Sequence, residues 1–184
     1  MNKTSKALNF NDAKLKGVTL IDEGNQIGLF ILLGLESGLR VGDMLKLKKE
    51  DFFRDGKKFF VRFEAQKTKN KATRPVSERV YNEVNKGINE VVFYNYKYKC
   101  PYSKMWVNRN LQSIFKAEHI KAKQQGLNIS AHSLRKSAGL QVYENCGLET
   151  CRDFLLHSSY DVTKAYLNVS TTELNEKLSR VFGF

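Results

Sequence analysis

The feature that most constrains this chain is an apolar stretch that runs from Ile21 to Leu35. Its apolar side chains fall on every side of a helix and include Ile27, Leu29, Phe30, Ile31, Leu32, Leu33 and Leu35. Since such a helix must be buried on all sides, the stretch predicts the centre of a hydrophobic core. No apolar run in the sequence reaches the roughly 20 residues that span a bilayer. A chain of 184 residues is long enough for one domain around that core and short for two.

The hydrophobic period changes after this stretch. A second, amphipathic helix is expected over Arg40–Leu47. Strand-like alternation then marks Lys58–Ala65, and a polar turn over Lys67–Lys71 leads to a short return strand at Arg74–Ser77. Because proline cannot donate to a sheet, Pro75 puts the return strand at an edge or at its start. These segments predict a small antiparallel hairpin.

The rest of the chain is predicted to be mostly helical. Helices are expected over Glu78–Lys86, Trp106–Gln125, Ser133–Cys146, Glu149–Leu156, Val162–Leu167 and Thr172–Phe182. Gly87, Gly126 and Gly147 follow three of them, as glycine often does at helix ends. The Tyr- and Lys-rich segment Tyr94–Lys99 is expected to be a loop. The predicted fold class is therefore mainly α with a small antiparallel β-hairpin or sheet (α+β), with residues 1–184 in a single domain.

Charge is the most informative bulk property. Thirty-one Lys and Arg against nineteen Asp and Glu leave a net charge of +12 at pH 7. Between Lys46 and Arg74, eleven residues are basic and four are acidic. A basic domain with its charge concentrated in one segment favours a polyanionic partner, because neutralised phosphates release counterions. Nucleic acid is the expected partner. RNA is the weaker alternative, because the glycine–aromatic motifs of common RNA-binding modules are absent.

The cysteines and the first residues narrow the setting. Cys100, Cys146 and Cys151 form no Cys-x-x-Cys pair, so we expect reduced thiols and no structural metal. The N-terminal residues lack the apolar core of a signal peptide. We therefore expect a cytoplasmic protein without a membrane partner.

Two short motifs in the first half carry residues suited to a phosphate. A glycine turn delivers Arg40 to the start of a helix, with Asp43 three residues later on the same face. The expected hairpin turn carries Lys67. Taken alone, the first motif is the pattern of an ordinary surface ion pair. The second alone is the pattern of a solvated basic turn.

Two more motifs lie in the second half. His132-Ser133-Leu134-Arg135 places an imidazole and a guanidinium together at a helix start, where backbone N–H groups also suit a phosphate. Leu156-His157-Ser158-Ser159 is followed, nine residues after the histidine, by Tyr166. By itself His-x-x-Arg is common, and one of eight tyrosines is more often a core or surface residue than a nucleophile. Only the four motifs together are informative.

In this order and spacing the motifs resemble those of the tyrosine recombinases, the phage integrase family. That family's pattern is Arg, Lys, His-x-x-Arg, His or Trp, then Tyr. The matching positions here are Arg40, Lys67, His132, Arg135, His157 and Tyr166, so the resemblance covers the chain from about Gly38 to Tyr166. It implies the tyrosine recombinase catalytic-domain fold. It also implies site-specific breaking and rejoining of DNA without a metal, a cofactor or ATP.

The resemblance implies that three side chains bind the phosphate and that a fourth orients one of them. Arg40 and Arg135 would bind its non-bridging oxygens, because planar and permanently charged guanidinium groups suit them better than an ammonium does. His157 would hydrogen-bond the phosphate and help to pack the site. Asp43 matches an accessory acidic position that would orient Arg40.

The resemblance also implies a nucleophile and its helpers. Tyr166 would form a covalent 3′-phosphotyrosyl link that conserves the bond energy. Its phenol has a pKa of about 10, so it needs a proton acceptor, and His132 would exchange that proton. Lys67 would protonate the departing 5′ oxygen, with the nearby Lys69 as the alternative lysine. Three further side chains, Lys69, Lys71 and Arg74, are expected to contact DNA.

Two features depart from the family pattern. Leu156 stands where many relatives have glycine, which changes turn geometry and no catalytic atom. Relatives also carry an N-terminal core-binding domain, which we do not expect here, so the chain is either a piece of a longer integrase or a short single-domain member. Residues 171–184 carry an apolar stripe and are expected to form a tail helix that packs on its own domain or on a neighbouring protomer.

The expected partner is double-stranded DNA, with a homo-tetramer formed at synapsis and a monomer in the absence of DNA. A bacterial or phage-encoded protein associated with the nucleoid would fit. One alternative with the same residues is DNA relaxation of the type IB topoisomerase kind. Another is an inactive DNA-binding relative, which would have lost catalytic residues that are all present here.

Overall fold

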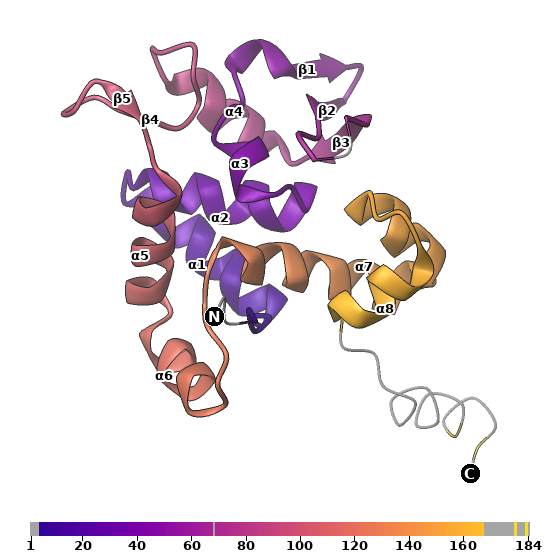
Figure 1. The fold of residues 1–184 in the computed structure, drawn as a ribbon. Helices are drawn as coiled ribbons and strands as arrows, with labels where there is room; N and C mark the ends of the chain where they lie inside the picture. Colours follow the sequence, from indigo (N-terminus) through magenta and orange to yellow (C-terminus); the bar gives the residue numbers. More distant parts are fainter. Residues whose placement is uncertain (1–3, 68, 168–178, 180–182, 184) are drawn as a thin grey trace. The chain divides into compact units, whose positions relative to one another are not determined.

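The computed structural model describes residues 4–67, 69–167, 179 and 183. The chain divides into two compact units, Met1–Ala138 and Gly139–Phe184, each with its own hydrophobic cluster. The first unit holds α1 (Phe10–Asp22), α2 (Gln26–Ser37), α3 (Val41–Met44), the 3-10 helix η1 (Lys49–Asp51), β1 (Phe52–Asp55), β2 (Lys58–Glu64), β3 (Lys71–Val76), α4 (Glu78–Lys86), β4 (Tyr94–Asn95), β5 (Cys100–Pro101), α5 (Lys104–Ile114) and α6 (Lys116–Gln124). Helix α7 (Ala131–Leu155) begins in the first unit and ends in the second, which also holds α8 (Tyr160–Leu167) (Figure 1). The predicted mainly α fold with a small antiparallel sheet is confirmed.

The core of the first unit is built on α2, as the apolar stretch predicts. Ile27, Ile31 and Leu33 are completely buried, and the helix packs against α1, α4 and β3 (Figure 1). It begins after Asn25, whose side chain accepts a hydrogen bond from the backbone N–H of Ile27. It ends at Gly38, which adopts the left-handed conformation with φ 62°. The polar cap and the glycine give this apolar helix two well-defined ends.

The prediction that this helix starts at Ile21 was wrong, because Ile21 belongs to α1. The chain turns between the two helices at Gly24, where φ is 72°. The helices approach so closely that a methyl group on Gly28 would lie 2.6 Å from the carbonyl oxygen of Gly17. Two glycines thus make the contact, and a hydrophobic pattern gives little sign of α1 because Ala13 and Gly17 make up half of its buried residues.

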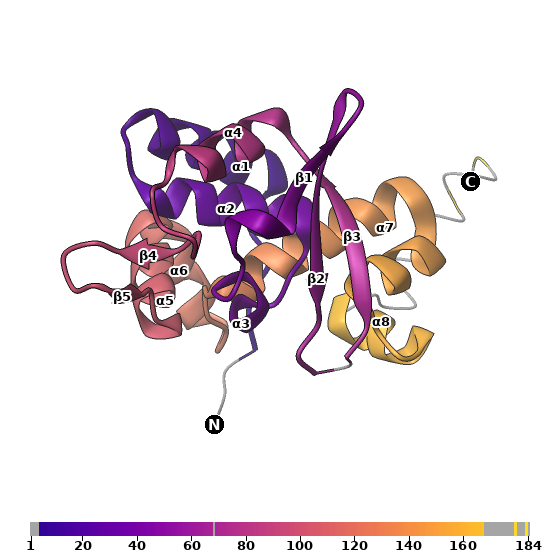
Figure 2. The same cartoon turned by 90° about the horizontal axis from the view of Figure 1, so that it is seen from above.

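The sheet of the first unit has three antiparallel strands in the order β1–β2–β3 (Figure 2). The predicted hairpin of β2 and β3 is confirmed, and Pro75 lies on the edge strand opposite Phe60. Two details were wrong. Strand β1 was missed because half of its four residues are charged, and Lys71, assigned to the turn, begins β3 opposite Glu64.

The segment after α4 also differs from its prediction. Tyr94–Lys99 was expected to be a loop, but the chain pairs Asn95 with Cys100 in a short hairpin of β4 and β5. The single helix expected over Trp106–Gln125 is divided into α5 and α6. Phe115 leaves helical geometry there (φ −103°, ψ 48°) and is 5% exposed, so its burial interrupts the helix.

The second unit is a small helical assembly around Cys151, Leu155 and Leu167. Gly147 takes φ 82° and ψ 178° inside α7 and divides it into two helical arms, as expected from a stop at this glycine. Gly139 lets the first arm approach the second, since a methyl group there would lie 3.0 Å from Leu155 Cδ1. The segment that carries His157 and Tyr166 packs against this cluster, which holds it in place.

The tail helix predicted over residues 171–184 lies outside the described residues, apart from Ser179 and Gly183. The single-domain organisation remains a prediction. Within the described part of the chain, no helix is both long and apolar enough to cross a membrane.

Candidate active site

Arg40 is presented by a tight turn between α2 and α3. The Ser37 hydroxyl donates to the carbonyl of Leu33 over 2.6 Å and accepts from the N–H of Leu39 at 3.3 Å. Gly38 supplies the left-handed residue that reverses the chain. Arg40 follows in an extended conformation, half-buried, at the N-cap position of α3. The backbone is therefore fixed on both sides of this arginine.

Arg135 is bonded to the same turn. Its Nη1 donates a hydrogen bond of 2.5 Å to the carbonyl oxygen of Gly38, and the residue is only 4% exposed. Arg135 projects from the start of α7, where the Ser130 hydroxyl accepts the N–H of His132 at 3.2 Å. The bond from Arg135 to the Gly38 carbonyl brings the second arginine of the predicted set to the turn that presents the first.

His132 lies among three cations. The protein around its imidazole lowers the pKa of His132, and the charges of Arg135, Arg40 and Lys104 lower it further. Since the residue still has an exposed surface, the nearby cations are the firmer cause. A lowered pKa keeps the imidazole neutral at pH 7. A neutral ring can accept a proton, as the predicted role requires.

Asp43 holds the segment that carries Lys67. The buried carboxylate accepts the backbone N–H of Gln66 at 3.2 Å, and the Gln66 amide donates to the carbonyl of Gly42 at 2.8 Å. Lys67 is the next residue and is exposed. Among the described residues, no hydrogen bond or ion pair joins Asp43 to Arg40, so its orienting role remains a prediction. The observed contact instead ties α3 to the end of β2.

The other basic residues of the hairpin have different surroundings. Lys69 is left-handed (φ 59°), and its ammonium lies 3.9 Å from a carboxylate oxygen of Glu64. Arg74 donates to the carbonyl of Thr73 and lies over the ring of Phe63, with 5.9 Å from Cζ to the ring centre. Lys71 is exposed at the start of β3. Lys67 therefore follows the tethered residue Gln66, whereas Lys69 lies near a carboxylate.

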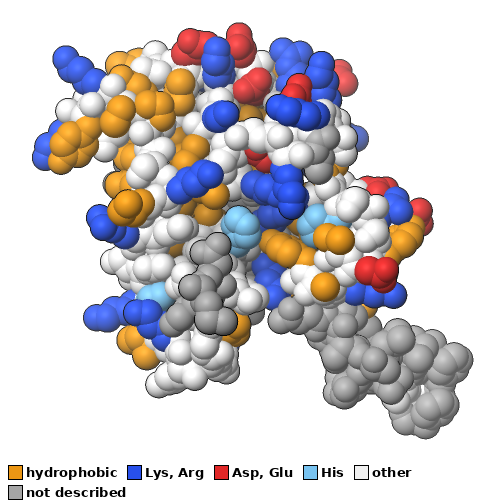
Figure 3. All heavy atoms as spheres, in the orientation of Figure 1, with side chains coloured by type: hydrophobic (Ala, Val, Ile, Leu, Met, Phe, Trp, Pro, Cys, Tyr) orange, Lys and Arg blue, Asp and Glu red, His pale blue; other side chains and the backbone are white. Residues whose placement is uncertain are grey.

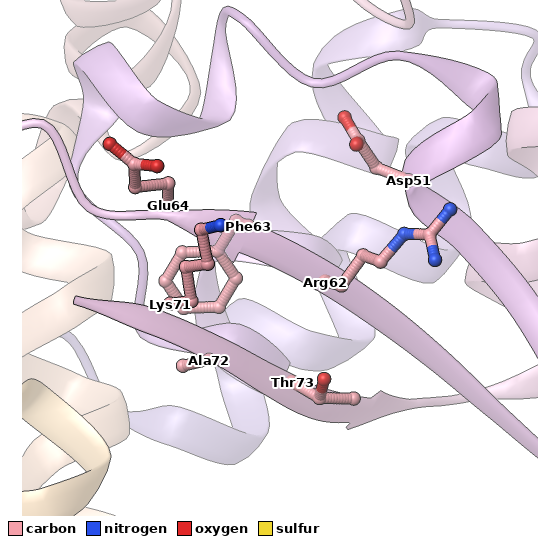
Figure 4. A pocket seen from close by; sticks show the side chains of 7 residues that line it. All are labelled: Asp51, Arg62, Phe63, Glu64, Lys71, Ala72 and Thr73. Atoms are coloured by element: carbon pink, nitrogen blue, oxygen red, sulfur yellow. The ribbon is translucent and has the colours of Figure 1, made fainter. Parts of the chain in front are cut away.

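A hollow of about 530 Å³ lies on the sheet beside this turn (Figure 4). Its lining residues are Asp51, Arg62, Phe63, Glu64, Lys71, Ala72 and Thr73. Arg62 extends toward Asp51 at one end, and its Nη2 donates to the carbonyl of Glu50 at 3.3 Å. The lining thus includes two basic residues, Arg62 and Lys71, and two acidic ones, Asp51 and Glu64. It contains Lys71 but none of the six predicted catalytic residues.

In the second unit, His157 is held by hydrogen bonds at its backbone and its ring. Its N–H donates to the carbonyl of Arg152 at 3.0 Å, and its Nδ1 lies 3.2 Å from the hydroxyl of Thr163. Thr163 is completely buried, and its hydroxyl donates to the carbonyl of Ser159 at 3.2 Å. Because that hydroxyl has one proton, Nδ1 must donate to it. The Nε2 atom then carries a hydrogen only when the ring is protonated.

Leu156 occupies the position where many relatives have glycine, and its backbone explains why glycine suits it. Its φ is 50°, in the left-handed region that a branched side chain rarely adopts. This residue reverses the chain between the last turn of α7 and His157. Leucine in place of glycine was predicted to affect the geometry of this turn, and the structure shows Leu156 in the left-handed conformation.

Tyr166 lies on α8 and packs against the small cluster of the second unit. Its ring meets the ring of His157 edge to face, with 5.1 Å between centres and 77° between planes. It is one turn beyond Thr163, so one helix face carries the tyrosine and the residue that orients the histidine. The structure therefore brings His157 and Tyr166 together.

Two groups of predicted residues result. Arg40, His132 and Arg135 are joined in the first unit, with Lys67 linked to them through Gln66, and His157 and Tyr166 meet in the second. Three residues that the motifs did not reveal, Gln66, Lys104 and Thr163, take part in these groups. The sequence offered a weak signal for two of them, since Gln66 adjoins Lys67 and Thr163 is one turn from Tyr166. Among the described residues, no three His, Cys, Asp or Glu side chains gather as metal ligands.

Comparisons with known proteins identify the family and the fold of the chain. The model of the phage integrase family matches residues 21–173. Among solved structures, the pre-cleavage complex of the XerH site-specific recombinase with its difH substrate superposes with a TM-score of 0.71 at 19% identity, over 97% of this chain and 55% of that one. The XerA recombinase gives 0.72 at 16% identity, over 98% and 66%. No curated protein matches the chain.

Lambda integrase is similar as well. Its dimer bound to a COC′ core site superposes with a TM-score of 0.65 at 20% identity, over 91% of this chain and 49% of that one. It is matched also as a tetramer bound to a Holliday junction. At identities this low, the superposition establishes a shared fold alone. The chain spans about half to two thirds of the length of these relatives.

Proposed function

The chain belongs to the phage integrase family, and from this premise we propose that it breaks and rejoins double-stranded DNA at specific sites through a covalent bond to Tyr166. The observation that carries the proposal is the hydrogen bond from Arg135 to the carbonyl of Gly38. This bond holds one guanidinium beside the turn that presents Arg40, with a neutral imidazole next to both. Paired guanidinium groups with a proton acceptor suit a phosphodiester under attack.

In the proposed reaction the two arginines bind the non-bridging oxygens of one DNA phosphate. Negative charge grows on these oxygens as a fifth ligand approaches phosphorus, so fixed cations stabilise the transition state more than the ground state. Removing one such donor typically slows the chemical step by about 10²–10³-fold. The burial of Arg135 supports this role, since little reorganisation is needed during the reaction.

The attacking atom is the phenolic oxygen of Tyr166. It forms a bond to phosphorus, the bond between phosphorus and the 5′ oxygen breaks, and the 3′ phosphate stays on the protein. The phenolic proton passes to His132, whose lowered pKa keeps it neutral and able to accept it. His157 donates from Nε2 to the phosphate when its ring is protonated, because Nδ1 is committed to Thr163.

The departing 5′ oxygen takes a proton from Lys67. Gln66 supports this choice over Lys69, because its two hydrogen bonds fix the residue just before Lys67 to the Arg40 turn. Lys69, Lys71 and Arg74 contact neighbouring phosphates along the duplex. Rejoining reverses each step with a 5′ hydroxyl from the same or another strand, so no external energy source is needed.

At the level of assembly, we propose that residues 1–184 act as one catalytic domain and that four copies meet on two DNA sites, as in the lambda integrase complex. The working compartment is the cytoplasm of a bacterial host, where its DNA lies. Type IB relaxation has no observation in its favour here.

The test uses duplexes that share one nick and differ in a randomised sequence around it. Cleavage near the nick releases a short strand, so rejoining is blocked and the covalent complex accumulates for capture in SDS. Tyr166→Phe removes only the nucleophilic oxygen. Tyr160→Phe, an exposed tyrosine on the same helix, is the matched control.

We expect wild type and Tyr160→Phe to retain DNA enriched in particular sequences, and Tyr166→Phe to retain none. Retention by Tyr166→Phe would overturn the assignment of the nucleophile, and no retention by wild type would overturn the enzymatic proposal. Two duplexes with an enriched sequence should exchange strands. Relaxation of supercoiled plasmid without strand exchange would contradict recombination.

A further inference from the structure

Lys104 lies against the turn that presents Arg40. It is the first residue of α5 and is exposed. A methyl group on Gly42 would lie 3.4 Å from its Cε and 3.5 Å from its Nζ. Gly42 is two residues beyond Arg40, so the ammonium group lies beside the backbone of α3. No sequence motif pointed to this lysine.

The ammonium of Lys104 also lies near Gln66 and acts on His132. The methyl position on Gly42 is 3.6 Å from the side-chain amide nitrogen of Gln66, which precedes Lys67. The charge of Lys104 is also one of the three that act on the imidazole of His132. Among the described residues, no carboxylate lies within ion-pair distance of Lys104. The ammonium is thus a cation without a protein counter-charge beside the predicted phosphate site.

The segment around Lys104 has the composition of a nucleic-acid contact. Residues 91–117 contain five Lys and Arg, seven aromatic residues and no Asp or Glu. Figure 3 shows blue and orange side chains over the β4–β5 hairpin and α5, without red ones. At the tip of the hairpin, Tyr96 and Tyr98 are exposed, and the ammonium of Lys97 lies 5.5 Å from the centre of the Tyr98 ring. Cations mixed with exposed aromatic rings suit the phosphates and bases of DNA.

We propose that Lys104 binds a backbone phosphate of DNA at the edge of the active site, as a contact outside the six-residue set. The proposal rests on the proposed function for the identity of the ligand. Being an exposed, flexible ammonium, Lys104 binds this phosphate equally before and during cleavage. It therefore strengthens the binding of DNA, and a binding measurement detects its contribution before any bond is broken.

The experiment measures binding of a random-sequence duplex over a range of KCl concentrations. Lys104→Gln removes the charge, Lys104→Arg keeps it, and Lys123→Gln removes another exposed lysine on α6 as the matched control. Loss of one phosphate contact lowers the slope of log K against log salt by about 0.9. At 0.15 M salt this corresponds to a roughly fivefold higher Kd. We expect both changes in Lys104→Gln only.

An unchanged slope in Lys104→Gln would overturn the proposal, as would an equal change in Lys123→Gln. Titration of His132 by NMR in the free protein supplies a readout independent of DNA, since Lys104→Gln should raise its pKa. A raised pKa without weaker binding would show that Lys104 acts on His132 alone, and would also overturn the proposal. Because this duplex binding needs no cleavage, the result stands apart from the covalent-capture test. If Lys104→Gln lowers the salt slope but the wild-type protein captures no DNA covalently, the proposed function is overturned and the phosphate contact of Lys104 still stands.

Discussion

Arg135 and Arg40 are far apart in the sequence, and the bond from Arg135 to the carbonyl of Gly38 brings them to one turn. The sequence indicates which residue types are present and in which order. It does not indicate that a backbone carbonyl joins them, because any residue supplies a carbonyl. The contributions of Gln66 and Lys104 were hidden for a similar reason. Their contacts follow from where α3 and α5 lie in space, and their residue types are ordinary.

The protonation of His132 gives the first prediction at the residue scale. Its pKa should lie below the usual value of 6.5, because the surrounding protein and three cations disfavour the imidazolium form. Between the lowered pKa and 6.5, the unfolded chain binds a proton that the folded chain does not. Stability from this group is therefore present above pH 6.5 and is lost as the pH falls through the folded pKa.

Two measurements check this prediction. NMR titration of the imidazole gives the pKa, and urea unfolding between pH 7 and pH 5 should show a smaller acid-induced loss in His132→Gln than in wild type. A pKa at or above 6.5 would contradict the account.

The choice of Lys67 as the proton donor gives the second prediction. Lys67→Ala should slow cleavage by about 10²–10⁴-fold, the usual contribution of a general acid. The rate should recover on DNA with sulfur in place of the bridging 5′ oxygen, because a thiolate departs without a proton. Single-turnover cleavage of the two substrates provides the measurement.

Lys69→Ala is the matched variant, two residues away in the same turn. It should cleave both substrates at rates near those of wild type. Recovery on the sulfur substrate in Lys69→Ala, and not in Lys67→Ala, would reverse the assignment.

At the scale of elements, the strongest patterns predicted the structure best. The apolar run became α2, and the alternation of Lys58–Ala65 became β2. Helix α1 was missed because it buries Gly17 against Gly28, and β1 because Arg54 and Asp55 interrupt its pattern. The split of α5 from α6 depends on the burial of Phe115, a tertiary contact that no local signal carries. Arg40, Lys67 and His157 lie between elements, where the chain turns, whereas Arg135 and Tyr166 lie within helices.

Leu156 gives a prediction about such a turn. Replacing it with Ala or with Gly removes the same side-chain contacts beyond Cβ, but only Gly adopts φ 50° without steric cost. A non-glycine residue in this conformation costs about 1–2 kcal/mol. Leu156→Gly should therefore be more stable than Leu156→Ala by about 1 kcal/mol, which reverses the usual order of these two residues. Urea unfolding of the pair measures the difference, and equal or lower stability of the Gly variant would refute the role of the backbone.

At the scale of the whole molecule, charge and fold point to one partner. A net charge of +12 favours DNA, and the chain keeps the recombinase fold at 16–20% identity. Identity can fall this far because the fold depends on where apolar side chains lie, and many residues satisfy that pattern. The six predicted residues are a small part of the sequence and occur in two groups. The central claim is that both groups act on one phosphate and that Tyr166 becomes bonded to it.

The most direct test is to map the bond itself. The trapped protein–DNA complex is digested with a nuclease and a protease, and tandem mass spectrometry locates the nucleotide on the peptide. The account predicts a 3′-linked nucleotide on Tyr166 and a free 5′ hydroxyl on the released strand. A nucleotide on Tyr160 or any other residue, or a link through a 5′ phosphate, would contradict it.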